Sequence, residues 1–365
     1  MQSYDVVEWG KPLQFAMRET PEPGPFEIRL RLTYCGVCHS DVHIRQGYFD
    51  MGGGVKSVLA ERGVRLPVTL GHEPVGIVEA VGSEVAGVHV GKTYLVNPWI
   101  GCGKCPACLR GQDNLCPAMA AMGMARPGGF ATHLMVPHAR YLVDIEGIDP
   151  AQAAMLACAG VTAYSAIQKI GPPQADQWVA VLGCGGLGLI AIAILKALGH
   201  QHIIACDIDD TKLEAAQAAG VQHVLNLKKQ GPAQLLEISK VGLYAMIDFV
   251  GSPATSALAL PSLQKGGRFV SVGLFGGAAT VPLVALAMRE ISLMGSAVGC
   301  TAQIRELVEL VRSGVLTLPS VQTRPLAQAE QSLQDLEAGR VIGRIVLDTG
   351  GEPTPAPSVP DQSAQ

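Results

Sequence analysis

Hydrophobic and polar residues alternate in short runs through the first third of the chain. The alternation is clearest in FEIRLRLTYCG (26–36), PVGIVEAVGSEV (74–85) and HVGKTYLVNP (89–98), which are separated by glycine and other turn residues. A period of two is typical of β-strands with one buried face. Because no helical period is evident in this part of the chain, we expect an antiparallel, barrel-like domain here.

After about residue 155 the pattern changes to apolar runs that alternate with alanine-rich helical stretches. The segments in question are WVAVLG (178–183), GLIAIAILKALG (188–199), HIIACD (202–207), DDTKLEAAQAAG (209–220), AMIDFVG (245–251) and GRFVSVG (267–273). Apolar strands between helices predict βαβ units, so we expect an α/β domain with a doubly wound parallel sheet covered by helices on both faces. The proline-rich and polar tail, 350–365, is expected to be disordered.

Length and charge narrow the function classes. A chain of 365 residues exceeds one typical core and predicts two domains. The formal net charge is −4, which argues against a nucleic-acid partner. The start of the chain has no basic segment followed by an apolar run, and the longest apolar stretch (186–199) is short and contains Lys196. We therefore expect a cytoplasmic protein that binds small molecules, with no membrane partner.

A glycine motif lies between a predicted strand and a predicted helix. Gly183, Gly185 and Gly188 have G-x-G-x-x-G spacing, and Asp207 ends the next predicted strand. In dinucleotide-binding domains such glycines let the pyrophosphate approach the helix N-terminus, and the acid accepts the ribose hydroxyl hydrogen bonds. Asp207 would repel a 2′-phosphate and so favours NAD, whereas Lys212 nearby leaves NADP as an alternative. The residues expected to bind the cofactor here are Gly183, Gly185, Gly186, Leu187, Gly188, Asp207 and Lys212.

Four cysteines lie close together in GCGKCPACLRGQDNLC (101–116). Cys102, Cys105, Cys108 and Cys116 have C-x2-C-x2-C-x7-C spacing. Cytosolic thiols stay reduced, so a metal site is favoured over disulfides. An iron–sulfur cluster is the alternative, but the bacterial cluster motif has a shorter gap before its last cysteine. Four thiolates complete the tetrahedron of a zinc ion and leave no open position, which predicts a structural zinc site.

Two further segments contain residues suited to a reacting centre. YCGVCHSDVH (34–43) contributes cysteine, histidine, serine and aspartate, and LPVTLGHEPVG (66–76) contributes His72 and Glu73. Taken singly, a cytosolic cysteine is most often a small buried hydrophobe, and a lone histidine is more often a satisfied core residue than a metal ligand. These residues therefore indicate a reacting centre only when they are considered together.

Several motifs together resemble one known family. CGVCHSDVH, GHEPVG, the four-cysteine segment, LACAGVTAY, GCGGLG and the terminal GRIVL occur in the order seen in the zinc-dependent alcohol dehydrogenases of the medium-chain dehydrogenase/reductase superfamily. The match spans nearly the whole chain. The resemblance implies a GroES-like catalytic domain (1–159 and 298–365), a central NAD-binding Rossmann domain (160–297) and an active site between them. It also implies a homodimer or homotetramer.

The resemblance implies that Cys38, His72 and Cys158 hold a catalytic zinc. Three protein ligands leave one open position, where a Lewis-acid metal can act on an alcohol while NAD accepts hydride. By the same resemblance Asp41 orients His72 and Glu73 lies behind the metal. From the residues alone, either acid could instead cap a turn.

The same resemblance assigns a proton relay and further cofactor contacts. Ser40 would pass the proton through the ribose hydroxyls to His43, although His43 could also be a solvated surface residue. Other implied contacts are Thr162 near the nicotinamide, Val272 and Gly273 beneath the ring, and Arg344 towards the pyrophosphate. Outside this family, Thr162 and Val272 would be ordinary core residues and Arg344 a surface charge.

The substrate is the least determined feature. The glycine-rich segment between Tyr48 and His72 is longer than in many relatives and lies, by resemblance, near the substrate entrance. Tyr48 and Trp99 are candidate pocket walls, which favours hydrophobic primary or secondary alcohols, although Tyr48 could pack on its own loop. The alternatives are a polyol dehydrogenase, disfavoured by Cys158 and the four-cysteine segment, and a zinc-stabilised NAD-binding module without turnover. A zinc-free quinone or enoyl reductase is disfavoured by the ligand motifs.

Overall fold

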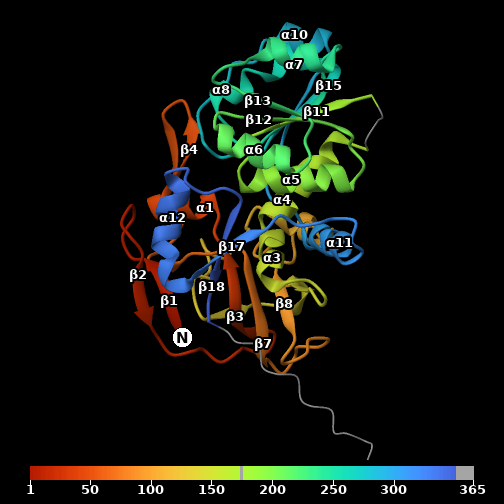
Figure 1. Cartoon of the computed structure of the whole chain (residues 1–365). Helices are drawn as coiled ribbons and strands as arrows, with labels where there is room; N and C mark the ends of the chain where they lie inside the picture. Colours follow the sequence, from red (N-terminus) through yellow and green to blue (C-terminus); the bar gives the residue numbers. More distant parts are fainter. Residues whose placement is uncertain (173–175, 351–365) are drawn as a thin grey trace, which may run out of the picture.

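The computed structural model describes residues 1–172 and 176–350 and has two lobes (Figure 1). The tail expected to be disordered, apart from Gly350, lies outside these residues. One lobe is rich in antiparallel strands and contains both the start of the chain and the segment before residue 350. The other lobe is a helix-covered parallel sheet. The predicted α/β class with a β-rich first domain is therefore confirmed.

The β-rich lobe is built around a seven-stranded sheet. Its strand order is β10-β8-β7-β3-β18-β17, and β9 also pairs with β3. The bounds are β3 (Ile28–Gly36), β7 (Pro74–Val81), β8 (Thr93–Val96), β9 (His133–Val136), β10 (Leu142–Asp144), β17 (Val321–Pro325) and β18 (Arg344–Asp348). Because β18 pairs antiparallel with β3, the late part of the chain completes the sheet that the early part begins.

Smaller elements flank this sheet. β1 (Gln2–Val6), β2 (Gln14–Met17) and β6 (Val68–Thr69) form a three-stranded sheet, and β4 (Tyr48–Gly52) and β5 (Val55–Val58) form a separate hairpin. Short helical segments are α2 (Pro106–Leu109), η1 (Asp113–Leu115), η2 (Ala139–Tyr141), α3 (Pro150–Ala154), η3 (Met155–Ala157), η4 (Leu326–Gln328) and α12 (Ala329–Glu337). The hairpin extends from the β-rich lobe towards the other lobe (Figure 1).

The second lobe contains a six-stranded parallel sheet of order β13-β12-β11-β14-β15-β16. The strands are β11 (Trp178–Leu182), β12 (His202–Asp207), β13 (His223–Asn226), β14 (Leu243–Asp248), β15 (Leu263–Ser271) and β16 (Ser292–Gly295). The helices are α5 (Gly186–Ala197), α6 (Asp210–Ala218), α7 (Pro232–Ser239), α8 (Pro253–Ser256), α9 (Ala259–Ser262) and α10 (Leu283–Met288). Val179 and Val181 pack in one core, Ala180 and Leu182 in another. Burial of both faces explains why these strands read as continuous apolar runs.

Two longer helices lie where the lobes meet. α4 (Ala159–Ile170) and α11 (Thr301–Arg312) contribute to one core that also contains residues of β11 and of β10. Within the described residues, no single helix has the length and apolar composition needed to cross a membrane. Only the bent pair of helical segments Pro150–Ala157 and Ala159–Ile170, taken together, reaches that length and composition.

The first third also contains a helix of eight residues, although no helical period is evident there in the sequence. HSDVHIRQ forms α1 (His39–Gln46), which the sequence pattern did not reveal because the segment is mostly polar. The Asp41 carboxylate accepts a hydrogen bond from the Cys38 amide at 3.0 Å and so caps the first turn. Gly47 ends the helix with a φ of 86°, a left-handed conformation that favours glycine. Arg45 joins α1 to α12 through ion pairs with Glu330 and Glu337.

Candidate active site and metal centres

Three buried side chains from separate segments meet at one point between the lobes. Cys38 immediately precedes α1, His72 lies between β6 and β7, and Cys158 immediately precedes α4. The two sulfurs and a ring nitrogen of His72 lie within 4.8 Å of one another. Two cysteines and one histidine form a known ligand set for catalytic zinc, in which the fourth position stays open.

Hydrogen bonds to Asp41 hold this region in an orientation that lets His72 bind a metal ion. His72 Nδ1 lies 3.0 Å from Asp41 Oδ1, which also accepts the Gly71 amide at 3.2 Å. The other ring nitrogen, Nε2, is buried and has no hydrogen-bond partner in the described part of the chain. A buried polar atom without a partner is costly, and a metal ion would satisfy it. Asp41 therefore does two things: it caps α1 and it orients His72.

The two cysteines of this group differ in acidity. A hydrogen bond from Cys158 lowers the pKa of Cys38 well below its ordinary value, with His72 acting in the same direction and burial against it. The shared bond with Cys38, followed by burial, raises the pKa of Cys158. One thiolate is thus favoured even before a metal binds. Together with the unpartnered His72 nitrogen, this donor set fits zinc.

Glu73 and Arg344 form a buried ion pair behind the three ligands. Burial raises the pKa of Glu73 to about 7, although Arg344 acts in the opposite direction. The second Glu73 oxygen accepts the Ala159 amide at 3.3 Å, at the start of α4. The Arg344 side chain also passes the glycine loop: a Cβ added to Gly186 would lie 2.4 Å from its Cδ. Arg344 thus lies between Glu73 and the glycine loop.

Ser40 and His43 lie three residues apart on α1. Ser40 Oγ is 3.8 Å from Cys38 Sγ. The His43 ring is half-buried between His39 and Phe49, with ring centroids 5.4 Å from each. Burial, with a further contribution from His39, lowers the pKa of His43. His43 is therefore neutral and able to accept a proton at neutral pH.

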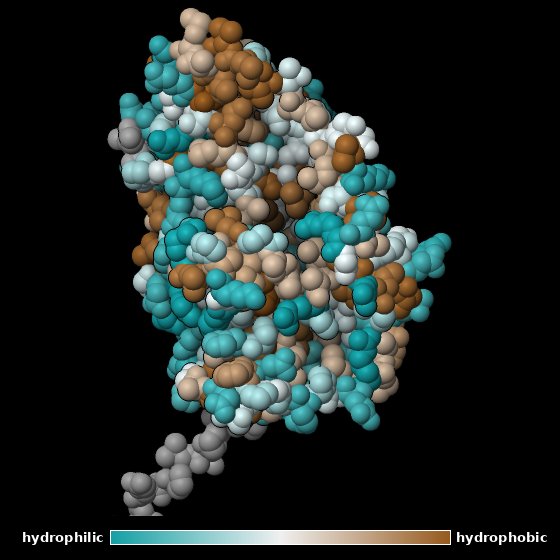
Figure 2. Space-filling model, turned by 180° about the vertical axis from the view of Figure 1, so that it is seen from behind, coloured by the Kyte–Doolittle hydropathy of each residue, from teal (hydrophilic) through white to brown (hydrophobic). Residues whose placement is uncertain are grey.

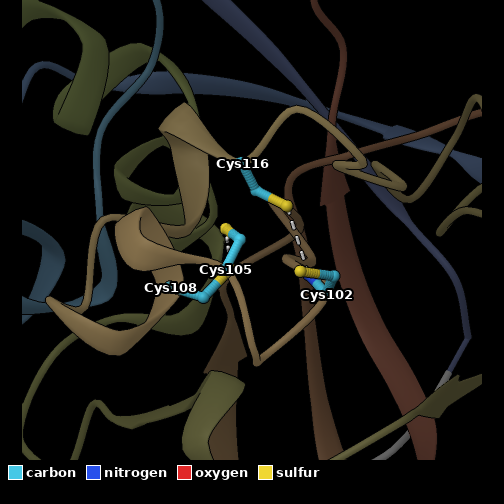
Figure 3. Close-up of side chains that lie close together, drawn as sticks. All are labelled: Cys102, Cys105, Cys108 and Cys116. Carbon is cyan, nitrogen blue, oxygen red and sulfur yellow. Dashed lines mark hydrogen bonds between the residues drawn. The ribbon is translucent and has the colours of Figure 1, made fainter.

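The four cysteines of segment 101–116 form a separate cluster, shown in Figure 3. The sulfurs of Cys102, Cys105, Cys108 and Cys116 lie within 4.8 Å of one another, and Cys116 Sγ accepts the Cys102 amide at 3.3 Å. Backbone amides of Lys104 and Cys105 point at Cys102 and lower its pKa to about 6. A compact set of four sulfurs with amide donors fits a closed, tetrahedral zinc site.

The glycine loop has the shape that a dinucleotide requires. Gly183 has a φ of 88°, and a Cβ on Gly188 would lie 1.9 Å from the Gly183 carbonyl oxygen, so both positions need glycine. A Cβ on Gly185 would meet nothing within 4 Å, which leaves that side open for a ligand. Asp207 ends β12 beside the loop and accepts the Cys184 amide at 2.7 Å. Gly186 begins α5 with Leu187, and Lys212 is half-exposed on α6. The cradle fits NAD.

The remaining predicted cofactor contacts lie around a cavity of about 770 Å³ and in the nearby helix α4. Val272 and Gly273 line this cavity together with the ends of β15 and β16 and the start of α11. Thr162 lies one turn after Cys158, and its hydroxyl is buried without a hydrogen-bond partner among residues that the structure describes. A bound group would satisfy this hydroxyl.

Apolar side chains surround Cys38 and Cys158. The Trp99 indole donates to the Ala157 carbonyl at 3.1 Å, and its ring centroid lies 5.7 Å from that of His72. The residues packed with Cys38 and Cys158 are Trp99, Met119, Ala121, Met124 and Val298. Sequence reasoning missed Met119 and Met124, because methionine carries no motif. Tyr48 lies elsewhere: its ring packs against Lys56 of its own hairpin, 3.8 Å from the ammonium group.

Comparisons with known proteins agree with this geometry. Residues 24–147 match the family model described as the alcohol dehydrogenase GroES-like domain, and residues 186–313 match the zinc-binding dehydrogenase model. An NAD-dependent alcohol dehydrogenase of Sulfurisphaera tokodaii is 36% identical over 95% of this chain and 99% of its own. An alcohol dehydrogenase of Geobacillus stearothermophilus is 32% identical, with 95% and 98% covered.

Solved structures give the same result. The alcohol dehydrogenase of the archaeon Aeropyrum pernix superposes with a TM-score of 0.86 at 32% identity, covering 95% of this chain and all of that one. Identity above 30% over nearly the full length, in sequence and in structure, confirms the resemblance of the motifs. The chain belongs to the zinc-dependent alcohol dehydrogenases of the medium-chain dehydrogenase/reductase superfamily.

Proposed function

We propose that this enzyme oxidises hydrophobic primary or secondary alcohols to aldehydes or ketones, reversibly, with NAD and a catalytic zinc. The observation that carries the proposal is the buried group of Cys38, His72 and Cys158, in which His72 Nε2 has no hydrogen-bond partner in the described ranges. Cys38 and Cys158 pack among apolar side chains, and Cys158 immediately precedes α4.

The protein residues have distinct tasks in this proposal. Zinc, held by Cys38, His72 and Cys158, supplies Lewis-acid polarisation, while NAD supplies the hydride acceptor. Asp41 holds the His72 ring, and the Glu73–Arg344 pair supports the site from behind. The proton leaves by way of the Ser40 hydroxyl and reaches His43, whose lowered pKa keeps the ring able to accept it.

The proposed cofactor site lies on the glycine loop. The pyrophosphate would be held at the start of α5 by Gly183, Gly185, Gly186, Leu187 and Gly188. The nicotinamide end of the cofactor would contact Thr162, Val272 and Gly273. Asp207 favours NAD over NADP, because its carboxylate would accept ribose hydroxyl hydrogen bonds and repel a 2′-phosphate. The positive charge of Lys212 acts in the opposite direction, because it would attract the 2′-phosphate of NADP. Arg344 reaches the loop with its stem, while its guanidinium pairs with Glu73.

The apolar side chains that pack around Cys38 and Cys158 favour hydrophobic substrates over polyols. Trp99 is fixed by its indole hydrogen bond, and Met119, Met124 and Val298 pack against the same buried cluster. Thioether and indole groups offer polarisable contacts but no strong acceptors for several hydroxyl groups. A polyol would therefore lose hydrogen bonds to water on entering this site.

We propose further that the enzyme is a cytoplasmic homodimer or homotetramer. Cytoplasmic conditions keep thiolate ligands reduced, as two cysteine-rich zinc sites require. An apolar patch at the end of the second lobe supports self-association (Figure 2). Leu283, Val284 and Met288 of α10 are each more than 70% exposed, and Leu293 of the edge strand β16 is also exposed. A second copy that paired with this edge would bury them.

A substrate panel tests the proposed function. Zinc-loaded enzyme is mixed with NAD or NADP and with ethanol, hexan-1-ol, benzyl alcohol, cyclohexanol or sorbitol, and NADH or NADPH formation is followed by absorbance. We expect NAD-dependent turnover with kcat/KM at least about tenfold higher for the apolar alcohols than for sorbitol, from the desolvation cost of the extra hydroxyls. Preference for sorbitol would favour a polyol dehydrogenase, and no turnover with any alcohol at full zinc occupancy would favour a non-catalytic NAD-binding module.

The pH dependence of alcohol oxidation tests the relay. Because burial lowers the pKa of His43 from its ordinary value of 6.5, the acidic limb of the kcat profile should lie on the low side of pH 6.5. Replacing His43 by glutamine should lower kcat near neutral pH and remove this limb. His138, which lies on an exposed turn, provides the matched control. An unchanged profile for His43→Gln would contradict the relay.

A further inference from the structure

Asp248, which has no place in the mechanism above, is fully buried at the carboxyl end of β14. One carboxylate oxygen accepts the amides of Val250 and Gly251 at 2.9 and 3.0 Å, and the other accepts the Thr255 hydroxyl at 2.8 Å. A charge-assisted network of this kind fixes its donors more firmly than neutral hydrogen bonds do. The carboxylate therefore determines the path of the loop after β14, residues 249–253.

This loop holds two parts of the expected cofactor site. The Val250 side chain lies against the glycine loop, since a Cβ on Gly183 would be 2.8 Å from Val250 Cγ2. The Asp248 carbonyl accepts the amides of Val272 and Gly273 at 2.9 and 3.0 Å. The loop after β14 thus contacts the pyrophosphate side and the nicotinamide side of the site together.

The same loop also holds segment 272–277 through backbone hydrogen bonds. The Phe275 and Gly276 amides donate to the carbonyls of Val250 and Gly251, each at 3.1 Å. A Cβ on Gly251 would lie 1.9 Å from the Gly273 carbonyl oxygen, so the two segments are in direct backbone contact. Displacement of the first segment would therefore displace the second.

Segment 272–277 in turn touches the hairpin of the other lobe. A Cβ on Gly52 would lie 2.4 Å from the Gly277 carbonyl oxygen, and one on Gly276 would lie 2.7 Å from Asp50 Cβ. Phe49 of the same hairpin packs against His43. A continuous chain of contacts therefore joins Asp248, the nicotinamide side of the cofactor site and the hairpin β4–β5.

We propose that Asp248 is a positioning residue for the cofactor, which holds Val272 and Gly273 in place and, through segment 272–277, sets the contact between the Rossmann lobe and the hairpin 48–58. The inference rests on the proposed use of NAD. It assigns no chemistry to Asp248, because both oxygens of its carboxylate already accept hydrogen bonds, from Val250, Gly251 and Thr255.

The first test measures NADH binding directly. Asp248→Ala and the milder Thr255→Val, which removes one of the carboxylate's donors, are compared with the wild type by NADH fluorescence titration of zinc-loaded protein. We expect the Kd for NADH to rise about tenfold or more in Asp248→Ala and less in Thr255→Val, because the buried donors of the loop lose their acceptor. Bound zinc and kcat at saturating NAD should change less than about threefold.

The second test addresses the contact with the hairpin. Gly52→Ala places a methyl group against Gly277, whereas Gly54→Ala has nearly the same φ, 81° against 84°, and meets nothing within 4 Å. Hydrogen exchange should accelerate in residues 272–277 for Gly52→Ala and Asp248→Ala, and the Kd for NADH should rise in both, but not in Gly54→Ala.

The outcomes distinguish failure of the proposed function from failure of the role proposed for Asp248. If the wild type binds no NADH, the proposed function fails. If the wild type binds NADH and Asp248→Ala, folded with both zinc ions, binds it equally well, the positioning role of Asp248 is wrong. Equal effects of Gly52→Ala and Gly54→Ala would show that strain in the hairpin, and not its contact with Gly277, is responsible, and would overturn the link between the lobes.

Discussion

Replacing Cys38 by alanine should abolish alcohol oxidation while leaving the fold intact. The substitution removes one of the three buried donors that meet between the lobes, and with it the thiolate that the hydrogen bond from Cys158 favours. Lewis-acid activation contributes several kcal/mol, and about 1.4 kcal/mol corresponds to tenfold in rate, so kcat should fall by about a thousandfold or more. Zinc per chain, measured by mass spectrometry, should fall from two to one.

Cys35→Ala is the matched control for this prediction. Cys35 is also buried and lies three residues earlier, but it does not belong to the ligand group. Its loss removes packing against Gly71 and Gly129 without removing a donor. Turnover per folded molecule should therefore persist in Cys35→Ala. Activity that survived in Cys38→Ala, with zinc content unchanged, would refute the assignment of the catalytic ligands.

The parts of the fold that the sequence predicts well are those with a regular period. The alternation in β3, β7 and β8 and the apolar runs of β11, β12 and β14 correspond to strands, because one or both faces of these strands are buried. The glycine loop is equally predictable, since its spacing marks a dinucleotide site and two of its glycines, Gly183 and Gly188, meet a steric demand that few other residues satisfy. By contrast, α1 has no apolar period, and its stability comes from a cap and from α12.

The candidate site shows a different limit of sequence reasoning. No spacing rule joins Cys38, His72 and Cys158, so their meeting was predicted only by family resemblance. Long-range partners such as Glu73 for Arg344 depend on tertiary packing over 271 positions and leave no local signal. The same is true of the contact between Gly52 and Gly277. The domain boundaries at 159/160 and 297/298 stay predictions, because α4 and α11 pack into one core where the lobes meet.

Loss of one sulfur from the four-cysteine cluster should lower the stability of the protein first, and its activity only as a consequence. Replacing Cys116 by serine breaks a closed set of four sulfurs and removes the acceptor of the Cys102 amide. Structural zinc sites contribute about 10–16 kcal/mol in small zinc-dependent peptides, and even a loss of several kcal/mol lowers Tm by about 5–10 °C in a domain of this size. We expect such a shift by calorimetry, and a fall from two zinc ions per chain to one.

The neighbouring residue provides the control that separates a structural from a catalytic role. Leu115 is 60% exposed and contributes no sulfur, so Leu115→Ala should keep both zinc ions and the wild-type Tm. At temperatures well below its unfolding transition, Cys116→Ser should keep kcat within about threefold of the wild type, since a metal site with four sulfur ligands leaves no position for substrate. Loss of turnover in Cys116→Ser at unchanged Tm would instead show that this segment acts on the active site directly, through residues such as Met119 and Ala121 that follow Cys116 and pack against Cys38 and Cys158.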